Sequence, residues 1–203
     1  MLPFDVILFD VGGVLLTNGW DHGERAAAAE RFHLDAAELE TRNTVVFQAW
    51  DRGEITLDQY LSSTVFYEQR NFSREEFAAF LLSQSRLLPD GALDILKDLA
   101  AGGKYILGAL NNEARETNEY RFNKFGLRSC FEVTLSSCYL GLRKPEEAIF
   151  RLAIDVMGGK PERILFIDDR QENVDAAKEK GMVAIRFTGA ETLRRELCAL
   201  GIF

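Results

Sequence analysis

Short apolar runs alternate with helical segments along most of the chain, and this alternation constrains the fold more than any other feature. The first run, Val6–Phe9, is unbroken and stops at Asp10, which is typical of a strand buried on both faces. Similar runs occupy residues 105–110, 131–135, 164–167 and 182–187. A helical pattern separates each run from the next. The sequence therefore predicts an α/β fold with a doubly wound, five-stranded parallel sheet.

Residues 17–87 interrupt this alternation, because several helical patterns follow one another there without a convincing strand. Capping patterns at Asp35, Thr56 and Ser73 mark three helix starts. We therefore expect an inserted, wholly helical cap that moves on linkers near 15–18 and 86–89 and shields the reaction from water. The predicted domains are a core formed by residues 1–16 and 88–203 and a cap formed by residues 17–87.

Composition excludes several classes of function. The net charge of −8 argues against general affinity for nucleic acid or an anionic membrane. The first residues lack the basic, uninterrupted apolar pattern of a signal peptide or a membrane span, so a cytoplasmic protein is expected. Three cysteines without a C-x-x-C pair, and only two histidines, make a zinc site improbable. A metal here should be a hard cation held by carboxylates.

Polar residues follow four of the predicted strands or the loops after them. In an open parallel sheet, ligands bind beyond the carboxyl ends of the strands, so these residues should lie together. They are Asp10 with Gly12 and Gly13, Asn111 with Asn112, Arg143 with Lys144 and Pro145, and Asp168 with Asp169. Two adjacent aspartates at a strand end need a cation or a basic group to neutralise them, and Mg²⁺ prefers such ligands.

In this order, the four motifs resemble those of the haloacid dehalogenase superfamily, and the likeness covers essentially the whole chain. The phrase Asp168-Asp169-Arg-Gln-Glu-Asn173 is similar to that of its phosphatase-type branches, and the helical insert is similar to its cap. The resemblance implies a magnesium-dependent phosphoric monoester hydrolase. Its substrate would be a small phosphorylated metabolite, cleaved through an aspartyl-phosphate intermediate on Asp10.

The resemblance also implies a role for each motif residue. Asp10 would be the nucleophile, Lys144 would offset the charge of Asp10 and the phosphoryl group, and Asn111 would donate a hydrogen bond to a phosphoryl oxygen. The expected substrate-binding residues are Gly12, Asn111, Asn112 and Lys144. The expected metal ligands are Asp10, the main-chain carbonyl of Gly12 and Asp168, with Asp169 binding directly or through water. Asn173 is expected to be a partner in the site, the N-cap of a helix starting at 174, or both.

One departure from the family pattern affects the chemistry. Many phosphatases of the superfamily carry a second aspartate two residues after the nucleophile as general acid and base, but this chain has Gly12 there. The vacancy predicts slow turnover, a good leaving group or a replacement acid. Asp21, His22 and Glu113 are the candidates for that replacement.

Two other functions compete with the phosphatase. Dehalogenases of the superfamily also lack the second aspartate, but they need no magnesium and would leave the acidic pair at Asp168 and Asp169 poorly explained. A non-catalytic module that binds a phosphorylated metabolite is the other alternative, because Gly12 and Asn111 both depart from the catalytic pattern. A monomer or a homodimer is the default expectation for the assembly.

Overall fold

The computed structural model describes residues 3–203, so Met1 and Leu2, the first two residues of the predicted core, lie outside it. Its sheet has five strands, all parallel, in the order β3-β2-β1-β4-β5. The strands are β1 (Val6–Phe9), β2 (Ile106–Asn111), β3 (Val133–Ser136), β4 (Ile164–Asp168) and β5 (Val183–Arg186). The predicted doubly wound α/β fold is confirmed, and the strand ends differ from the expected ones by one or two residues.

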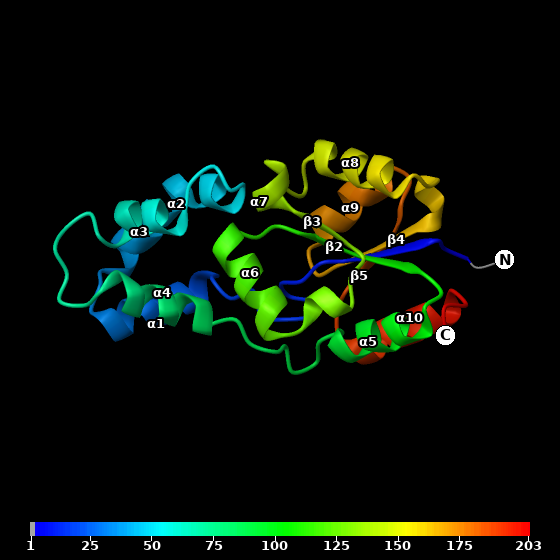
Figure 1. The fold of residues 1–203 in the computed structure, drawn as a ribbon, viewed down its shortest axis with the longest axis horizontal. Coiled ribbons are helices and arrows are strands. Elements are labelled where there is room, and N and C mark those ends of the chain that lie inside the picture. Colours follow the sequence, from blue (N-terminus) through cyan, green and yellow to red (C-terminus); the bar gives the residue numbers. More distant parts are fainter. Residues whose placement is uncertain (1–2) are drawn as a thin grey trace.

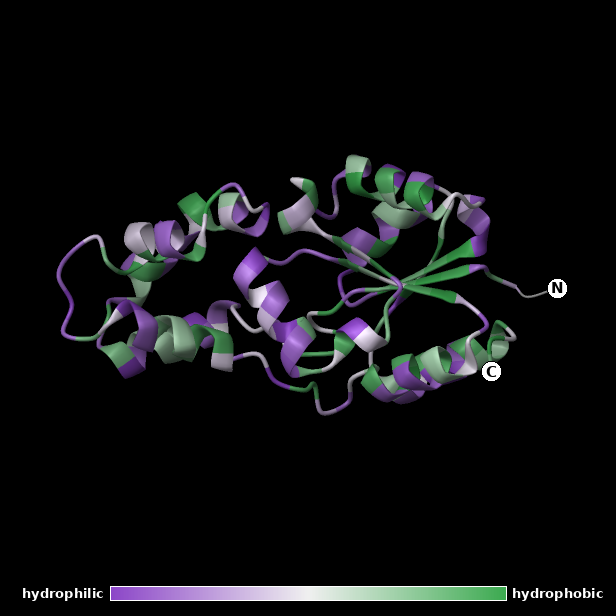
Figure 2. Ribbon diagram, viewed as in Figure 1, coloured by the Kyte–Doolittle hydropathy of each residue, from purple (hydrophilic) through white to green (hydrophobic). Residues whose placement is uncertain are grey.

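Helices cover both faces of this sheet (Figure 1). One face packs on α5 (Leu93–Gly102), α6 (Arg115–Lys124) and α10 (Ala190–Ala199) through a core that includes Leu96, Phe122 and Leu197. The other packs on α8 (Glu147–Met157) and α9 (Gln171–Glu179) through Phe150 and Val174. Figure 2 shows the strands as the most consistently hydrophobic elements, as burial on both faces requires. Strand β1 is fully buried and lies at the centre of the strand order. The residue that follows it, Asp10, therefore lies at the middle of the edge formed by the carboxyl ends of the strands.

Short elements complete the core. The 3-10 turns η1 (Leu127–Ser129) and η2 (Pro161–Arg163) precede β3 and β4, and the one-turn helix α7 (Ser137–Leu140) follows β3. None of the helices among residues 3–203 combines the length and the hydropathy that crossing a lipid bilayer requires.

Four helices lie between β1 and α5 and pack around an apolar cluster of their own. They are α1 (His22–Phe32), α2 (Ala36–Asp51), α3 (Leu57–Thr64) and α4 (Arg74–Ser83). The cluster is aromatic: Phe32, Phe77 and Trp20 pack against one another, and the rings of Trp50 and Tyr60 stack at 4.2 Å. We call this four-helix segment the helical insert. Its treatment as a separate, movable domain stays a prediction.

The ends of the insert helices follow the capping chemistry of the sequence. Asp35, Thr56 and Ser73 are the N-caps of α2, α3 and α4, and each side chain accepts a hydrogen bond from the backbone three residues later. The first insert helix carries a capping box that the sequence analysis missed, with Asp21 as N-cap and Glu24 reaching back to its backbone. This fixes Asp21 and its neighbours directly after the first linker.

Two sets of polar contacts hold the insert against the core. The buried Arg121 of α6 donates to the carbonyl of Thr17 at 2.9 Å and to the Ser85 hydroxyl at 3.0 Å, which ties both linkers to one guanidinium. At the C-terminal end of α2, Asp51 pairs with Arg143 of the core at 3.1 Å. The insert therefore sits over the carboxyl ends of the strands (Figure 1).

Candidate active site

The side chain of Asp10 lies at the end of the central strand and is largely buried. One of its oxygens, Oδ1, accepts a hydrogen bond from the backbone amide of Val11 at 2.8 Å and pairs with the Lys144 ammonium at 3.0 Å. The other oxygen, Oδ2, accepts no hydrogen bond from any residue in 3–203. Asp10 therefore has one anchored oxygen and one that is open to the pocket, the arrangement that a carboxylate nucleophile requires.

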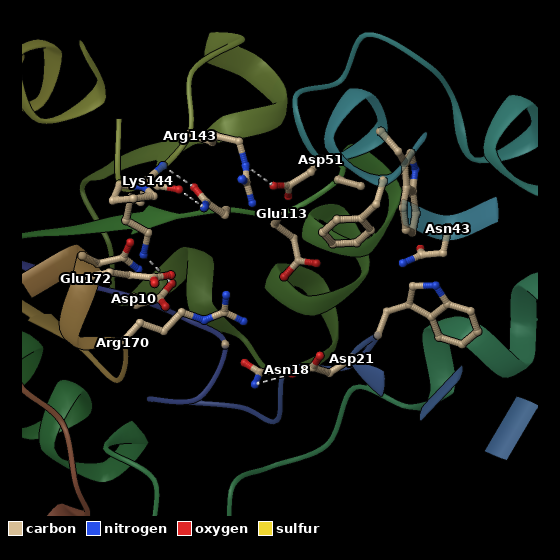
Figure 3. Close-up of a pocket in the computed structure, with 18 of the residues that line it drawn as sticks. Asp10, Asn18, Asp21, Asn43, Asp51, Glu113, Arg143, Lys144, Arg170 and Glu172 are labelled. Carbon is tan, nitrogen blue, oxygen red and sulfur yellow. Dashed lines mark hydrogen bonds and ion pairs between the residues drawn. The ribbon is translucent and has the colours of Figure 1, made fainter. Parts of the chain in front are cut away.

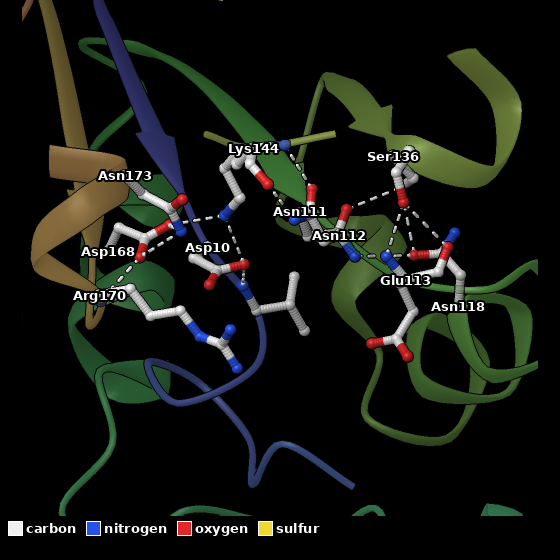
Figure 4. Close-up of polar contacts among 12 residues, drawn as sticks. Asp10, Asn111, Asn112, Glu113, Asn118, Ser136, Lys144, Asp168, Arg170 and Asn173 are labelled. Carbon is white, nitrogen blue, oxygen red and sulfur yellow. Dashed lines mark hydrogen bonds and ion pairs between the residues drawn. The ribbon is translucent and has the colours of Figure 1, made fainter. Parts of the chain in front are cut away.

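Lys144 is only 1% exposed and reaches the centre of the acidic cluster from the loop before α8. Its ammonium contacts Asp10 at 3.0 Å and Asp168 at 2.6 Å (Figure 4). The loop itself is held by Asn112, whose amide donates to the Lys144 carbonyl and accepts from its backbone nitrogen, both at 2.8 Å. Asn112 thus positions the lysine backbone.

Asp168 and Asp169 differ sharply in how their oxygens are used. Both oxygens of Asp168 are hydrogen-bonded: Oδ1 accepts from the Arg170 backbone at 2.8 Å and from Asn173 at 2.9 Å, and Oδ2 accepts from Lys144. Asp169 instead keeps a buried Oδ1 without any hydrogen-bond partner. Asp10, Asp168 and Asp169 each offer one oxygen, and these three oxygens lie within 4.8 Å of one another. An unpaired buried carboxylate oxygen in such a cluster fits a bound hard cation.

Gly13 makes room for Asp169. A Cβ atom added to Gly13 would stand 2.4 Å from Asp169 Oδ2, and the backbone there has a φ of +74°. Glycine has no Cβ atom and adopts a positive φ without strain, so it is the residue that fits this position. The glycine after Gly12 therefore allows the fourth motif to approach the first.

The electrostatics of the cluster depend on burial. The pKa of Asp10 is raised to about 7, mainly by burial; Lys144 opposes this rise, and the charges of Asp168 and Asp169 add to it. Burial also disfavours the charged form of Lys144, but Asp10 and Asp168 hold the pKa of this lysine above its ordinary value. Burial, with the adjacent Asp168, raises the pKa of Asp169. The three carboxylates thus carry more negative charge than one lysine neutralises, which a cation would relieve.

A pocket of about 280 Å³ opens between these residues and the helical insert (Figure 3). Strand ends and loops of the core provide one wall, with Asp10, Gly12 and Lys144. The insert provides the opposite wall. Its lining residues are Asn18, Trp20, Asp21, Arg25, Asn43, Phe47, Trp50 and Asp51. The Asp10 carboxylate therefore faces a surface that is mostly polar but carries three aromatic rings.

The structure brings most, but not all, of the expected site residues to this pocket. Asp10, Gly12, Asn112 and Lys144 line it. Asn111 does not: its amide nitrogen donates to Asn118 at 3.1 Å, and its oxygen accepts from the Ser136 hydroxyl at 2.7 Å (Figure 4). The donor that was expected to serve a phosphoryl oxygen is used inside the core.

Asn173 is a partner in the site and not a helix N-cap. The helix α9 begins at Gln171, so Asn173 lies in its first turn, where its amide donates to both oxygens of Asp168. The expectation of a helix starting at 174 was wrong because no side chain caps this helix, whose N-cap is Arg170. Asp168 itself instead accepts the Arg170 backbone amide.

The three candidates for the missing acid differ in position. The His22 ring is exposed and pairs with Glu40, outside the pocket lining. Asp21 lines the pocket but caps α1. Glu113 also lines the pocket, and Arg121 donates to it at 2.5 Å. A Cβ atom added to Gly12 would stand 3.0 Å from Asn18 Oδ1 and 3.5 Å from Arg121 Nη1. Asn18 donates to Asp21 and Arg121 donates to Glu113, so both acids lie one residue away from the space that Gly12 leaves vacant.

Several pocket residues were not found from the sequence. Arg170 follows the acidic pair, and its guanidinium points into the pocket beside Asp10 (Figures 3 and 4). Its adjacency to the fourth motif was a usable signal, as it was for Arg143, which the sequence analysis placed with Lys144. Asn43 and Asp51 lie on the second insert helix, far from any motif, and only the folded chain places them here.

Comparisons with known proteins agree with this geometry. The sequence profile of the haloacid dehalogenase-like hydrolases matches residues 4–181. Flavin mononucleotide hydrolase 1 of Arabidopsis thaliana is 30% identical over 81% of this chain, which spans 65% of that protein's length. A sesquiterpene phosphatase of Aspergillus oryzae is 25% identical over 96% of this chain and 95% of its own.

Solved structures show the same fold. A magnesium complex of a haloacid dehalogenase family enzyme from Bacteroides thetaiotaomicron superposes with a TM-score of 0.81 at 22% identity, over 96% of this chain and 98% of that one. The family profile covers most of the 203 residues, including the ends of β1 and β4, which carry Asp10 and Asp168, and the loop that carries Lys144. The chain belongs to the haloacid dehalogenase-like hydrolase family.

Proposed function

We propose that this protein is a magnesium-dependent phosphatase that cleaves a small phosphorylated metabolite through an aspartyl-phosphate on Asp10. The observation that carries the proposal is the cluster of Asp10, Asp168 and Asp169, in which the buried Lys144 pairs with Asp10 and Asp168 and only Asp10 lines the pocket. Two curated relatives support it, since both are named as enzymes that hydrolyse phosphate esters.

In this proposal, the chain's own residues supply the nucleophile and its setting. Asp10 attacks phosphorus with the open Oδ2, while the Val11 amide and Lys144 hold Oδ1. The bond from phosphorus to the leaving oxygen breaks, and water then releases phosphate from Asp10 in a second displacement. Lys144 and Arg170 offset the negative charge that gathers when the phosphoryl group approaches the carboxylate. Closure of the pocket by the insert excludes bulk water from the ester.

We further propose that Asp169, rather than Asp168, contacts the magnesium directly, together with Asp10 and the Gly12 carbonyl. The buried Oδ1 of Asp169 has no other partner, whereas both oxygens of Asp168 are already hydrogen-bonded. Asp168 would then orient Lys144 and stay in the outer shell of the metal. When bound, the ion supplies charge neutralisation for the phosphoryl oxygens.

Substituting the two aspartates separately tests this assignment. In EDTA, Asp169→Asn should raise the free energy of unfolding by about 1 kcal/mol, because it removes an unpaired buried charge. Asp168→Asn should lower it by about 1–3 kcal/mol, because it weakens the bonds to Lys144 and Asn173. Urea unfolding measures the free energy of unfolding of both variants, and calorimetry measures their affinity for Mg²⁺. Equal signs for the two changes, or unaltered Mg²⁺ affinity in Asp169→Asn, would contradict the assignment.

The vacancy at Gly12 predicts a strong dependence on the leaving group. Residue 12 is a glycine, so no side chain at this position can protonate the leaving oxygen. The p-nitrophenyl group leaves without a proton but an alkyl oxygen needs one, so p-nitrophenyl phosphate should be hydrolysed faster than alkyl phosphates. Gly12→Asp should narrow the ratio of the two rates by about tenfold, since general acid catalysis contributes two to four powers of ten. Gly12→Asn is the control, because it fills the same space beside Asn18 and Arg121 without an acid. Equal ratios in the two variants would show that a stand-in such as Glu113 already protonates the leaving group.

Turnover of a broad panel of phosphate esters with and without Mg²⁺ tests the function itself. We expect magnesium-dependent release of phosphate and, after acid quenching, a protein mass increased by one phosphoryl group located on Asp10. A protein that binds phosphorylated ligands tightly but turns none over would be the binding module. Release of halide from a 2-haloacid without magnesium would make it a dehalogenase, a function that the unpaired oxygen of Asp169 disfavours.

A further inference from the structure

The insert wall of the pocket contains one polar side chain whose donor has no partner. Asn43 lies on α2, is 6% exposed and lines the pocket opposite Asp10 and Lys144 (Figure 3). Its amide oxygen accepts a hydrogen bond from the Tyr60 hydroxyl at 2.6 Å. Its amide nitrogen has no hydrogen-bond partner among residues 3–203. Polar groups of largely buried side chains are normally hydrogen-bonded, so this pocket-facing nitrogen is available for a ligand.

A relay of hydrogen bonds fixes which end of the Asn43 amide faces the pocket. The Trp20 indole N–H can only donate, and it donates to the Tyr60 oxygen at 2.8 Å. Tyr60 has a single hydroxyl proton, which is therefore directed to Asn43. The amide oxygen of Asn43 must point to Tyr60, and its NH₂ group must point away from it. Burial raises the pKa of Tyr60, so the hydroxyl keeps this proton.

The charged groups around Asn43 are already paired within the protein. Arg25 makes two hydrogen bonds to Glu40, at 2.8 and 2.9 Å, and a third to the Trp20 carbonyl. Asp51 pairs with Arg143. The free donor at this end of the pocket is thus a neutral amide, which suits a neutral acceptor, namely a hydroxyl or carbonyl oxygen, rather than a second anionic group.

We propose that Asn43 determines the substrate class by donating a hydrogen bond to a hydroxyl or carbonyl oxygen on the leaving group of the phosphate ester. This inference rests on the proposed phosphatase function and goes beyond it. Substrates with such an oxygen, as in sugar phosphates, satisfy the buried NH₂. Esters with a hydrocarbon leaving group leave it unpaired, so their kcat/KM should be about tenfold or more lower. Trp20 and Tyr60 are positioning residues, because they act only through Asn43.

The test compares the specificity of variants that leave the fold and the metal site in place. We measure kcat/KM in the presence of Mg²⁺ for three esters: glucose 1-phosphate, ribose 5-phosphate and flavin mononucleotide. Each value is divided by the kcat/KM for phenyl phosphate, whose leaving group has no further hydroxyl or carbonyl oxygen. Asn43→Asp keeps the acceptor for Tyr60 and removes the donor. We expect this ratio, for the best of the three substrates, to fall about tenfold or more. The exposed Asn71→Asp, which adds the same charge elsewhere on the insert, should leave it unchanged.

A second variant keeps the proposal testable if Asn43→Asp folds poorly. Tyr60→Phe retains Asn43 but frees its amide to rotate, so the same ratio should fall several-fold, mainly through a higher KM for the hydroxylated ester. An unchanged ratio in both variants overturns the role of Asn43. So does a parent protein that prefers phenyl or farnesyl phosphate to all three test substrates. Failure of the parent to hydrolyse any phosphate ester, phenyl phosphate included, would instead refute the phosphatase function.

Discussion

Replacing Asp10 by asparagine is expected to lower kcat by at least about three powers of ten, because the amide cannot attack phosphorus as the carboxylate does. The change should do little harm to the fold. The near-isosteric amide keeps an oxygen for the Val11 amide and Lys144, and it removes a buried negative charge whose pKa burial raises to about 7. Activity is measured with p-nitrophenyl phosphate and Mg²⁺, and stability by urea unfolding.

Asp5→Asn is the matched control for this experiment. Asp5 lies just before the opposite end of β1, is exposed and pairs with Arg163 outside the pocket. Its variant should keep parental activity. If Asp10→Asn kept more than about a tenth of the parental kcat, covalent catalysis by this residue would be refuted. If Asp10→Asn lost activity but also unfolded at a much lower urea concentration, the loss would report on folding instead.

That Asp10, Lys144 and Asp168 lie together was predictable from the sequence because a parallel sheet collects the carboxyl ends of its strands at one edge. Asp10 and Asp168 lie 134 and 24 residues from Lys144 in the chain, yet both are within ion-pair distance of it. The alternation of buried runs and helices was enough to predict that meeting. The same alternation, when interrupted, indicated the helical insert.

The details of the site depend on contacts that no local pattern contains. Lys144, Asn173 and the Arg170 backbone all donate to Asp168. Asp169 is therefore the member of the acidic pair that keeps an oxygen without a hydrogen bond. Asn111 occupies the position of an expected phosphate ligand, but Asn118 and Ser136 satisfy its amide in the core. Asn43 sits in mid-helix and gains its direction from residues 17 and 23 positions away in the sequence. Such relays exist only in the folded chain.

Lys144→Met is expected to lower the free energy of unfolding more than any other single change in the site, and to reduce activity as well. Methionine fills nearly the same volume but leaves Asp10 and Asp168 buried without their cation. Removing one partner of a buried ion pair costs about 3–5 kcal/mol of unfolding free energy. Urea unfolding in EDTA at pH 8 measures this loss. The exposed Lys97→Met, which breaks only a surface pair with Asp94, should change it by less than about 0.5 kcal/mol.

The pH dependence of the Lys144→Met effect identifies its cause. The pKa of Asp10 is raised to about 7 in the folded protein, so the folded state binds a proton that the unfolded chain has already released. The stability that this proton contributes is present at acidic pH and is lost as the pH rises through about 7. Without Lys144, the pKa of Asp10 rises further, so the cost of the substitution should shrink between pH 8 and pH 5.5 as Asp10 becomes protonated.

Adding Asp10→Asn to Lys144→Met separates charge from packing. If the uncompensated carboxylates cause the destabilisation, the double variant should regain about 1–2 kcal/mol of the unfolding free energy at pH 8, because one of the two buried charges is gone. A loss that is equal at pH 5.5 and pH 8, and that the second substitution does not relieve, would mean that the lysine stem holds the loop by packing alone. In that case the ammonium would be needed only to offset the charge of the incoming phosphoryl group, and it would contribute nothing to the stability of the metal-free protein.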